Sequence, residues 1–218
     1  MTRPVRFHER HLWWQLGGGG GGGQVGRTDD MADRRGRCQQ LLEQVLQGVR
    51  TNVRRGVGIS NDLVGRLCSS ICTDRFKGVF SADLIPATRL LRDGAGDFAI
   101  VVNLATSDRP VGHFVAVCAD SRRVCYLDPY GLPHSYQEDV ARFLRRCGRP
   151  VEDPRRQVQS FDSVYCGLYA SLFAAYWDRR ADFALDFSDK DYAGNDVLIE
   201  GKPYSVVKMV DLLATLKQ

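Results

Sequence analysis

The residues around Cys166 are of types that favour a nucleophilic cysteine. Cys166 follows Gln159 by seven positions, in the segment Gln-Ser-Phe-Asp-Ser-Val-Tyr-Cys-Gly-Leu-Tyr, and an apolar run without proline occupies 168–177. The run predicts a buried helix with Cys166 in its first turn, where unpaired N–H groups and the helix dipole stabilise a thiolate. A thiolate held there is a candidate nucleophile, provided that a base lies near it.

The base is sought among only four histidines. His8 and His11 precede a run of seven glycines, 17–23, so we expect no fixed place in a core for either. His134 follows the turn sequence Asp-Pro-Tyr-Gly-Leu-Pro, whereas His113 opens the apolar, β-branched stretch His-Phe-Val-Ala-Val-Cys. That stretch predicts a core strand. Because a base must be placed rigidly beside its nucleophile, we expect His113 rather than His134 to act.

An orienting carboxylate is expected at Asp128. The segment Val124-Cys-Tyr-Leu-Asp-Pro-Tyr-Gly predicts a strand that ends in a turn, and the short polar stretch 119–123 separates it from the His113 strand. The two strands should form a hairpin with His113 and Asp128 at the same end. Asp128 could then accept a hydrogen bond from one imidazole nitrogen while the other faces Cys166. The alternative role for Asp128 is a turn-capping aspartate before proline.

Gln159 completes the candidate set. Its side-chain amide and the backbone N–H of Cys166 would supply two donors to an oxyanion. The alternative is an ordinary surface glutamine, and the spacing between Gln159 and the Cys-Gly pair favours the catalytic role.

The order His113, Asp128, Gln159, Cys166 resembles that of the adenovirus-type cysteine proteases, the adenain family. Leu-Asp-Pro-Tyr-Gly and Val-Gln-Ser-Phe-Asp-Ser-Val-Tyr-Cys-Gly-Leu-Tyr carry the resemblance, which extends over 59–218. It implies an α+β papain-like cysteine protease fold, shared with the ubiquitin-like-protein proteases, with the central nucleophile-bearing helix packed on a mixed sheet. It further implies a Cys-His-Asp triad with a Gln oxyanion hole.

The same resemblance implies a thiol endopeptidase that cleaves viral capsid and core precursors during virion maturation. The expected sites have Leu, Ile or Met, then any residue, then Gly-Gly or Gly-x before the cut. The expected location is the virion and the host cell nucleus. Leu16-Gly-Gly-Gly19 fits such a site, so the enzyme could trim its own leader.

Three features bear on which branch of the fold the chain resembles. Six residues separate Gln159 from Cys166, and Tyr165 precedes the cysteine. The ubiquitin-like-protein proteases usually have one residue fewer and an Asp-Cys-Gly triplet, so the adenovirus-type branch is favoured. Adenovirus enzymes usually carry glutamate in the acidic position, however, and Asp128 is typical of the other branch. A ubiquitin-like or SUMO-like isopeptidase is one alternative function, because ubiquitin-like tails end in Gly-Gly, and a non-catalytic binding module is another.

The resemblance also implies two cofactors, viral DNA and an activating viral peptide. In the family a cysteine before the glutamine forms a disulfide with that peptide, and Cys147 lies at a similar distance. The spacing of Val140, Phe143, Leu144 and Cys147 favours the alternative, a helix residue that faces the core. The candidate DNA contacts, which could equally form a solvated helix face, are Arg142, Arg145, Arg146, Arg149, Arg155 and Arg156.

Composition also bears on the redox compartment, on metal binding and on membrane contact. The chain has 218 residues and seven cysteines without a CxxC pair, which indicates free thiols in a reducing compartment. No histidine or cysteine near Cys68 and Cys72 completes a metal site, so we expect no metal. No apolar run approaches the roughly 20 residues of a membrane-spanning helix, and we expect a monomer with no membrane contact.

Charge and periodicity divide the chain at about residue 58. Residues 1–58 contain ten arginines and five acids, whereas 59–218 contain twenty basic and twenty-one acidic residues. We therefore expect an N-terminal extension, 1–58, and a protease domain, 59–218. Within the extension, 1–32 is a Gly-rich leader with too little apolar surface to fold, and 33–50 has the apolar spacing of an amphipathic helix.

The elements that must position the candidate residues follow from the same patterns. Apolar periodicity predicts helices near 60–71, 136–147, 166–178 and 205–216. Ser135-Tyr-Gln-Glu138 has the spacing of a capping box that would start the second of these helices. The stretch 97–103 predicts a buried strand beside the hairpin.

Overall fold

The computed structural model describes residues 43–44, 46–71, 75–92, 96–109, 112–175 and 187–199. The leader 1–32, with its Leu16–Gly19 site, and the helix predicted at 205–216 lie outside these ranges. So does most of the helix predicted at 33–50.

The named elements, in chain order, are α2 (Asn61–Ile71), β1 (Phe76–Ser81), η1 (Ala82–Leu84), α3 (Ala87–Arg92), β2 (Phe98–Asn103), β3 (Phe114–Ala119), β4 (Val124–Leu127), η2 (His134–Tyr136), α4 (Glu138–Cys147), β5 (Val151–Glu152) and α5 (Cys166–Ala175). Residues 46–54 and 192–199 are also helical. The predicted starts at 60 and 166, and the strand predicted at 97–103, agree with these bounds to within one residue.

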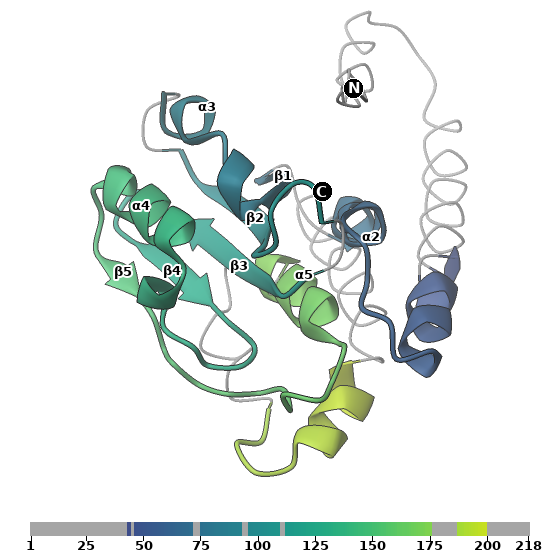
Figure 1. Ribbon diagram of the computed structural model, residues 1–218. Helices are drawn as coiled ribbons and strands as arrows, with labels where there is room; N and C mark the ends of the chain where they lie inside the picture. Colours follow the sequence, from purple (N-terminus) through teal and green to yellow (C-terminus); the bar gives the residue numbers. More distant parts are fainter. Residues whose placement is uncertain are drawn as a thin grey trace, which may run out of the picture. The chain divides into compact units, whose positions relative to one another are not determined.

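The strands form a five-stranded sheet in the order β1-β2-β3-β4-β5. The outer pairs, β1 with β2 and β4 with β5, are parallel, whereas β2-β3 and β3-β4 are antiparallel. The chain is therefore an α+β protein built on a mixed sheet (Figure 1). The predicted hairpin is its β3-β4 pair.

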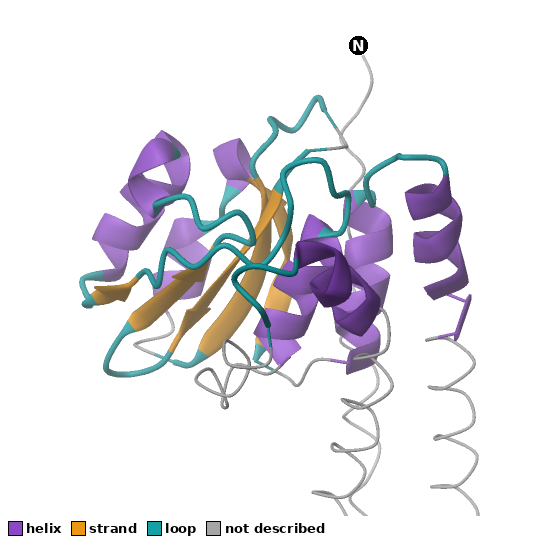
Figure 2. Cartoon of the chain, turned by 90° about the horizontal axis from the view of Figure 1, so that it is seen from below, coloured by secondary structure: helices purple, strands orange, loops and turns teal. Residues whose placement is uncertain are grey.

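Helices cover both faces of this sheet, as Figure 2 shows with helices on either side of the strands. Along β3, Phe114, Ala116 and Cys118 pack into the core cluster that contains α5, and the residues between them pack into the cluster that contains α4. Every residue of β2, β3 and β4 is consequently buried. This explains why their sequences are continuous apolar runs rather than alternations of polar and apolar residues.

Helix α5 is the central helix of the larger core. Its residues from Cys166 to Ala174 are all buried, as expected for a helix that is apolar on every side. It packs against β3, β2 and α2. A Cβ atom at Gly167 would lie 2.9 Å from Cγ2 of Val64, so glycine permits the close approach of α5 to α2.

The helical residues 46–54 belong to the same compact unit as the sheet. Leu46 and Val49 are almost fully buried in the core cluster of α5. The apolar face that the sequence assigns to this segment thus includes two residues that lie in the core.

The predicted capping box is wrong. Ser135 lies within η2, and α4 begins only at Glu138, after Gln137, which makes no side-chain cap. The backbone N–H of His134 donates to Asp153 Oδ2 at 3.1 Å. That tertiary contact accompanies a 3-10 turn, which the local Ser-x-x-Glu spacing could not reveal.

Two further findings concern the described ranges alone. None of their helices has the length and hydropathy needed to cross a membrane. All five cysteines within them are free thiols, namely Cys68, Cys118, Cys125, Cys147 and Cys166.

Candidate active site

The hairpin register explains why His113 and Asp128 meet. The β3-β4 ladder pairs Ala116 with Leu127, and His113 and Asp128 are the residues just outside the two strands. Continued outward, the same register would place Val115 opposite Asp128 and His113 opposite Tyr130. Side chains one or two positions apart on one face of an antiparallel pair lie within contact distance. His113 and Asp128 are therefore diagonal neighbours at one end of the hairpin.

The two side chains form a short, partly buried hydrogen bond. Nε2 of His113 lies 2.7 Å from Oδ1 of Asp128, and the side chains are 18% and 1% exposed. Because a carboxylate oxygen only accepts, Nε2 carries the hydrogen, and the lone pair of the neutral ring is on Nδ1. Asp128 is held in turn by the Tyr130 backbone N–H at 2.7 Å and by the Tyr126 hydroxyl at 3.4 Å.

Cys166 acts electrostatically on the His113 ring. Nδ1 is buried and makes no hydrogen bond of good geometry in the described part of the chain. Burial lowers the pKa of His113, but hydrogen bonding and charge from Asp128 and Cys166 outweigh this effect and raise the pKa to about 9. The imidazolium is thus favoured at neutral pH when a negative group stands at Cys166.

Cys166 occupies the first position of α5, as predicted. The Tyr165 carbonyl accepts from the N–H of Leu168 at 2.8 Å, so the helix begins at Cys166, whose own N–H has no acceptor within the helix. The cysteine is only 6% exposed. Its Sγ lies 4.0 Å from the carbonyl oxygen of Gly112, directly before His113.

Gly112 brings the His113 backbone close to β2. A Cβ atom at this position would lie 2.4 Å from Oδ1 of Asn103 and 2.6 Å from Cβ of Ala105. Asn103 is itself fully buried and donates to Oδ1 of Asn61 at the start of α2, at 2.8 Å. The loop that presents His113 therefore fits only because residue 112 lacks a side chain.

Gln159 is fully buried and bonded within its own loop. Its Nε2 donates to the carbonyl oxygen of Ser163 at 2.9 Å and lies 3.2 Å from the Ser163 hydroxyl, while its Oε1 is buried without a partner among the described residues. Its backbone N–H donates to the carbonyl of Pro129, adjacent to Asp128, at 3.0 Å. The loop is thus tied to the end of the hairpin.

Tyr130 is a site residue that the sequence interpretation missed. Its ring stacks on the His113 imidazole, with centroids 4.1 Å apart and an interplanar angle of 8°. The signal was available, because extending the hairpin register past Asp128 places residue 130 opposite His113. Reading Asp-Pro-Tyr-Gly only as a turn concealed it.

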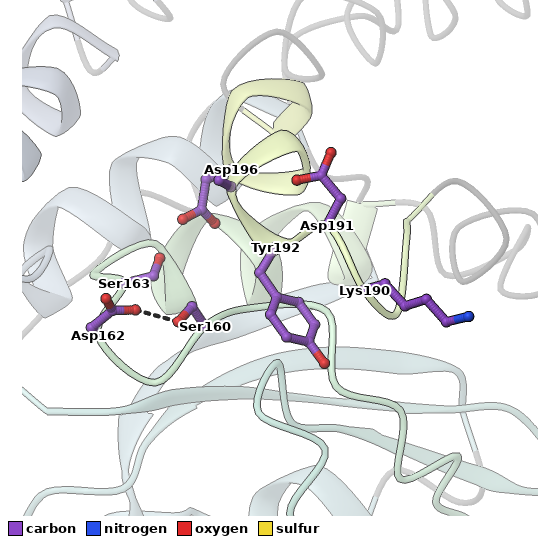
Figure 3. Close-up of a pocket in the computed structure, with 8 residues that line it drawn as sticks. Ser160, Asp162, Ser163, Lys190, Asp191, Tyr192 and Asp196 are labelled. Carbon is purple, nitrogen blue, oxygen red and sulfur yellow. Dashed lines mark hydrogen bonds between the residues drawn. The ribbon is translucent and has the colours of Figure 1, made fainter.

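A hollow of about 530 Å³ adjoins the loop between Gln159 and Cys166. One wall comes from that loop and the other from helix 192–199 and the two residues before it (Figure 3). Its lining includes Ser160, Asp162, Ser163, Lys190, Asp191, Tyr192 and Asp196. A bound chain that reached Cys166 from this side would meet a polar surface rich in carboxylates.

His134 is not among the residues that contact Cys166 in the described part of the chain. Nδ1 of His134 is 2.8 Å from Oδ2 of Asp153, and its ring meets the Tyr126 ring edge-on at 5.9 Å. These contacts fasten η2 to the segment after β5.

Cys147 is half-buried at the end of α4 and packs against the core cluster on that face. Burial raises the pKa of its thiol to about 11, against a smaller opposing effect of Arg149. A thiol that stays protonated at neutral pH is a poor partner for disulfide exchange, which favours the core-facing interpretation of Cys147 over the peptide disulfide.

Most of the six candidate DNA-contacting arginines are already bonded to other groups of the protein. Arg142 and Arg145 pair with Glu138 on their own helix. Arg149 and Arg156 donate to the backbone carbonyls of Asp120 and Phe187 at 2.6 Å. Of the other two, Arg146 is exposed, and Nε of Arg155 lies 3.9 Å from Asp153.

Within the described ranges, no group of three or more His, Cys, Asp or Glu side chains is arranged to hold a metal ion. Comparison of the sequence with models of known protein families gives no match, and comparison with curated proteins gives none either.

Proposed function

We propose that the chain is a cysteine endopeptidase with the papain-like fold of the adenain type. The observation that carries the proposal is the position of His113, whose imidazole bonds Asp128 through Nε2 and whose neighbour Gly112 has its carbonyl oxygen 4.0 Å from Sγ of Cys166. A carboxylate that orients an imidazole, which in turn activates a thiol, is a recurring arrangement in nucleophilic catalysis.

The reaction follows from these contacts. His113 takes the thiol proton on Nδ1, and the thiolate attacks the scissile carbonyl carbon. The N–H of Cys166 and the amide of Gln159 then hydrogen-bond the oxyanion. His113 returns its proton to the leaving amine as the C–N bond breaks. Water, deprotonated by His113, releases the acyl group and regenerates the thiol.

Gln159 must change partners during this reaction. Both of its amide hydrogens are directed at Ser163, and the longer contact, 3.2 Å to the hydroxyl, is the weaker one. We propose that the oxyanion replaces the Ser163 hydroxyl as the acceptor of that hydrogen. The contact with the Ser163 carbonyl holds the amide meanwhile.

The proposed substrates are viral capsid and core precursors cut next to glycine, in the virion and the host nucleus. The low exposure of Cys166, 6%, supports a preference for glycine, because a chain without side chains can reach a recessed thiol most readily. Viral DNA and an activating peptide are proposed as cofactors on the resemblance alone. The paired arginines on α4 give DNA binding there little support.

A ubiquitin-like or SUMO-like isopeptidase is the second candidate. The observation that favours it is the acid itself, because Asp128 rather than glutamate bonds the histidine. Such an enzyme would use the same residues on Gly-Gly tails. Incubation with a ubiquitin-like fusion and with a Leu-x-Gly-Gly peptide separates the two, since the endopeptidase should prefer the peptide.

The proposal is tested by alkylation with iodoacetamide across pH, followed by mass spectrometry of each cysteine. We expect Cys166 to react near pH 6 and to lose this reactivity in His113→Ala. Cys147 is the internal reference, because its pKa of about 11 keeps it unreactive there. Labelling of Cys166 no faster than Cys147, with and without added DNA and viral peptides, would contradict the proposal.

A further inference from the structure

Tyr130 contacts the proposed base, the acid and the oxyanion loop at once. Its ring lies parallel to the His113 imidazole at 4.1 Å, and its backbone N–H donates to Oδ1 of Asp128 at 2.7 Å. That oxygen is the one that accepts from Nε2 of His113. The imidazole is thus held both in its plane, by Asp128, and against rotation out of it, by the ring of Tyr130.

The phenol of Tyr130 extends to the loop that carries Gln159. It donates to the carbonyl oxygen of Ser163 at 3.3 Å, and the same oxygen accepts from Nε2 of Gln159 at 2.9 Å. One carbonyl therefore receives a hydrogen bond from Tyr130 and another from the proposed oxyanion donor. The position of the amide depends on the loop that Tyr130 anchors.

The loop is held against Tyr130 by two further contacts. Phe161, in the turn between Gln159 and Ser163, packs on the Tyr130 ring at 4.9 Å. The carbonyl of Pro129, the residue before Tyr130, accepts from the backbone N–H groups of Val158 and Gln159 at 2.9 and 3.0 Å. The start and the middle of the loop are consequently held against the turn that follows β4.

Gly131 makes this arrangement possible. It has a φ of +72°, and a Cβ atom there would lie 2.6 Å from the backbone nitrogen of Gln157. Only glycine allows the turn to reverse in the left-handed region and still lie directly on the backbone that leads into the loop carrying Gln159. Tyr130 therefore sits on a turn that packs against this backbone.

We propose that Tyr130 is a positioning residue that fixes the His113 imidazole and the Gln159 amide relative to each other. The inference rests on the proposed hydrolase function and adds a residue to it. Its ring stabilises the imidazolium through its π face, and its hydroxyl sets the Ser163 carbonyl that orients Gln159. Tyr130 does not touch the reacting atoms.

The ionisation of Tyr130 agrees with this role. Burial, together with the negative charges of Cys166 and Asp128, raises the pKa of the phenol to about 12. The hydroxyl therefore remains a donor to Ser163 at every pH at which a thiolate–imidazolium pair exists.

Two substitutions separate the two contacts, and the full chain can be used for both. Tyr130→Phe removes the hydroxyl and keeps the ring, whereas Tyr130→Leu removes both; the backbone N–H bond to Asp128 persists in each. Tyr136→Phe is the matched control, because Tyr136 lies in the same connection between β4 and α4 but is 70% exposed. The measurements are the pH profile of Cys166 alkylation, hydrolysis of a Leu-x-Gly-Gly peptide, and the thermal melting of each variant.

We expect Tyr130→Phe to keep the wild-type alkylation profile while kcat falls about tenfold and KM changes less than twofold, because only the oxyanion donor is displaced. Tyr130→Leu should lower alkylation at pH 6 by about threefold and kcat by about a hundredfold. Tyr136→Phe should match the wild type in both assays.

The outcomes distinguish this inference from the proposed function. A wild-type Cys166 without enhanced reactivity would contradict the proposed function itself. A reactive wild type whose alkylation profile and kcat are unchanged in both Tyr130 variants would overturn the inference alone. Lower melting temperatures with unchanged alkylation and kcat would also overturn it, since they would assign Tyr130 a purely structural role.

Discussion

The molecule contains two histidine–aspartate pairs that resemble each other closely in their local geometry. Nε2 of His113 lies 2.7 Å from Asp128, and Nδ1 of His134 lies 2.8 Å from Asp153. Both aspartates are nearly buried, and both histidines are partly exposed. Tyr126 lies between the pairs, with its ring edge-on to His134 and its hydroxyl donating to Asp128.

The pairs differ in the contacts that the histidine makes besides its bond to the aspartate. Asp153 accepts through the same oxygen from both the ring and the backbone N–H of His134, which makes the pair a local fastening of η2. His113 bonds Asp128 through Nε2, so Nδ1 is available to Cys166. Under the proposed function, only the His113–Asp128 pair has a chemical role, because its histidine keeps a second nitrogen for Cys166.

The sharpest way to break this comparison is to remove each imidazole. We expect His113→Ala to lower kcat for a Leu-x-Gly-Gly peptide by about 10³-fold or more, because the thiol loses its base. His134→Ala should change kcat by less than about twofold. Initial rates with the purified variants check this, and equal losses in the two variants would show that the pairs are not functionally distinct.

The acids give a smaller contrast. Asp128→Ala should lower kcat by about 10²-fold, because the imidazole loses its orientation, whereas Asp128→Asn should lower it only about tenfold, because an amide oxygen still accepts from Nε2. Asp153→Asn is the matched control and should leave kcat within about twofold. An Asp128→Ala enzyme with wild-type kcat would exclude Asp128 from the proposed mechanism.

The raised pKa of His113 should appear in stability. The pKa is 6.5 for an ordinary histidine and about 9 in the fold, so the folded state binds the proton more tightly. The added stability is complete below pH 6.5 and is lost as pH rises through 9. The free energy of unfolding should fall by up to about 3 kcal/mol over that interval.

Urea unfolding of the wild type, His113→Ala and His134→Ala at several pH values measures this fall. The decline should persist in His134→Ala and be reduced in His113→Ala, so the difference between the two variants isolates the contribution of His113. Parallel curves for all three proteins would show that His113 does not gain a proton on folding.

The smallest expected effect is the change in stability on breaking the His134–Asp153 pair. His134→Ala removes the ring contact with Asp153 and should lower the free energy of unfolding by about 1 kcal/mol, the usual net contribution of one hydrogen bond. Thermal melting at neutral pH checks this, with Tyr136→Phe as the control in the same 3-10 turn. A loss of several kcal/mol would mean that the pair supports the core rather than one turn.

Much of the fold was predictable because its signals are local. The continuous apolar stretches from Phe98 and Phe114 predicted buried strands, and the apolar run after Cys166 predicted the central helix. The Ser135–Glu138 capping box failed for the opposite reason. Its spacing is a local signal as well, but a contact with Asp153, distant in sequence, accompanies a 3-10 turn there instead.

The candidate site divides in the same way. The small number of histidines pointed to His113, and the predicted hairpin placed Asp128 at the same end. The structure brings the two side chains into contact. The sequence predicted donors at Gln159 but not that they would be directed at Ser163, because that contact depends on the path of the loop. Tyr130 was missed because a turn motif carries no information on what stacks above it.

The sequence by itself determined the residue types and their order along the chain: a cysteine at the start of an apolar helix, a histidine before one strand and an aspartate after the next. These are properties of short segments, set by periodicity and propensity. Only the tertiary structure decided which nitrogen of His113 bonds Asp128, which groups surround Cys166, and that Tyr130 connects His113 to the loop that carries Gln159. Such contacts join residues from separate segments, and their geometry is fixed by packing.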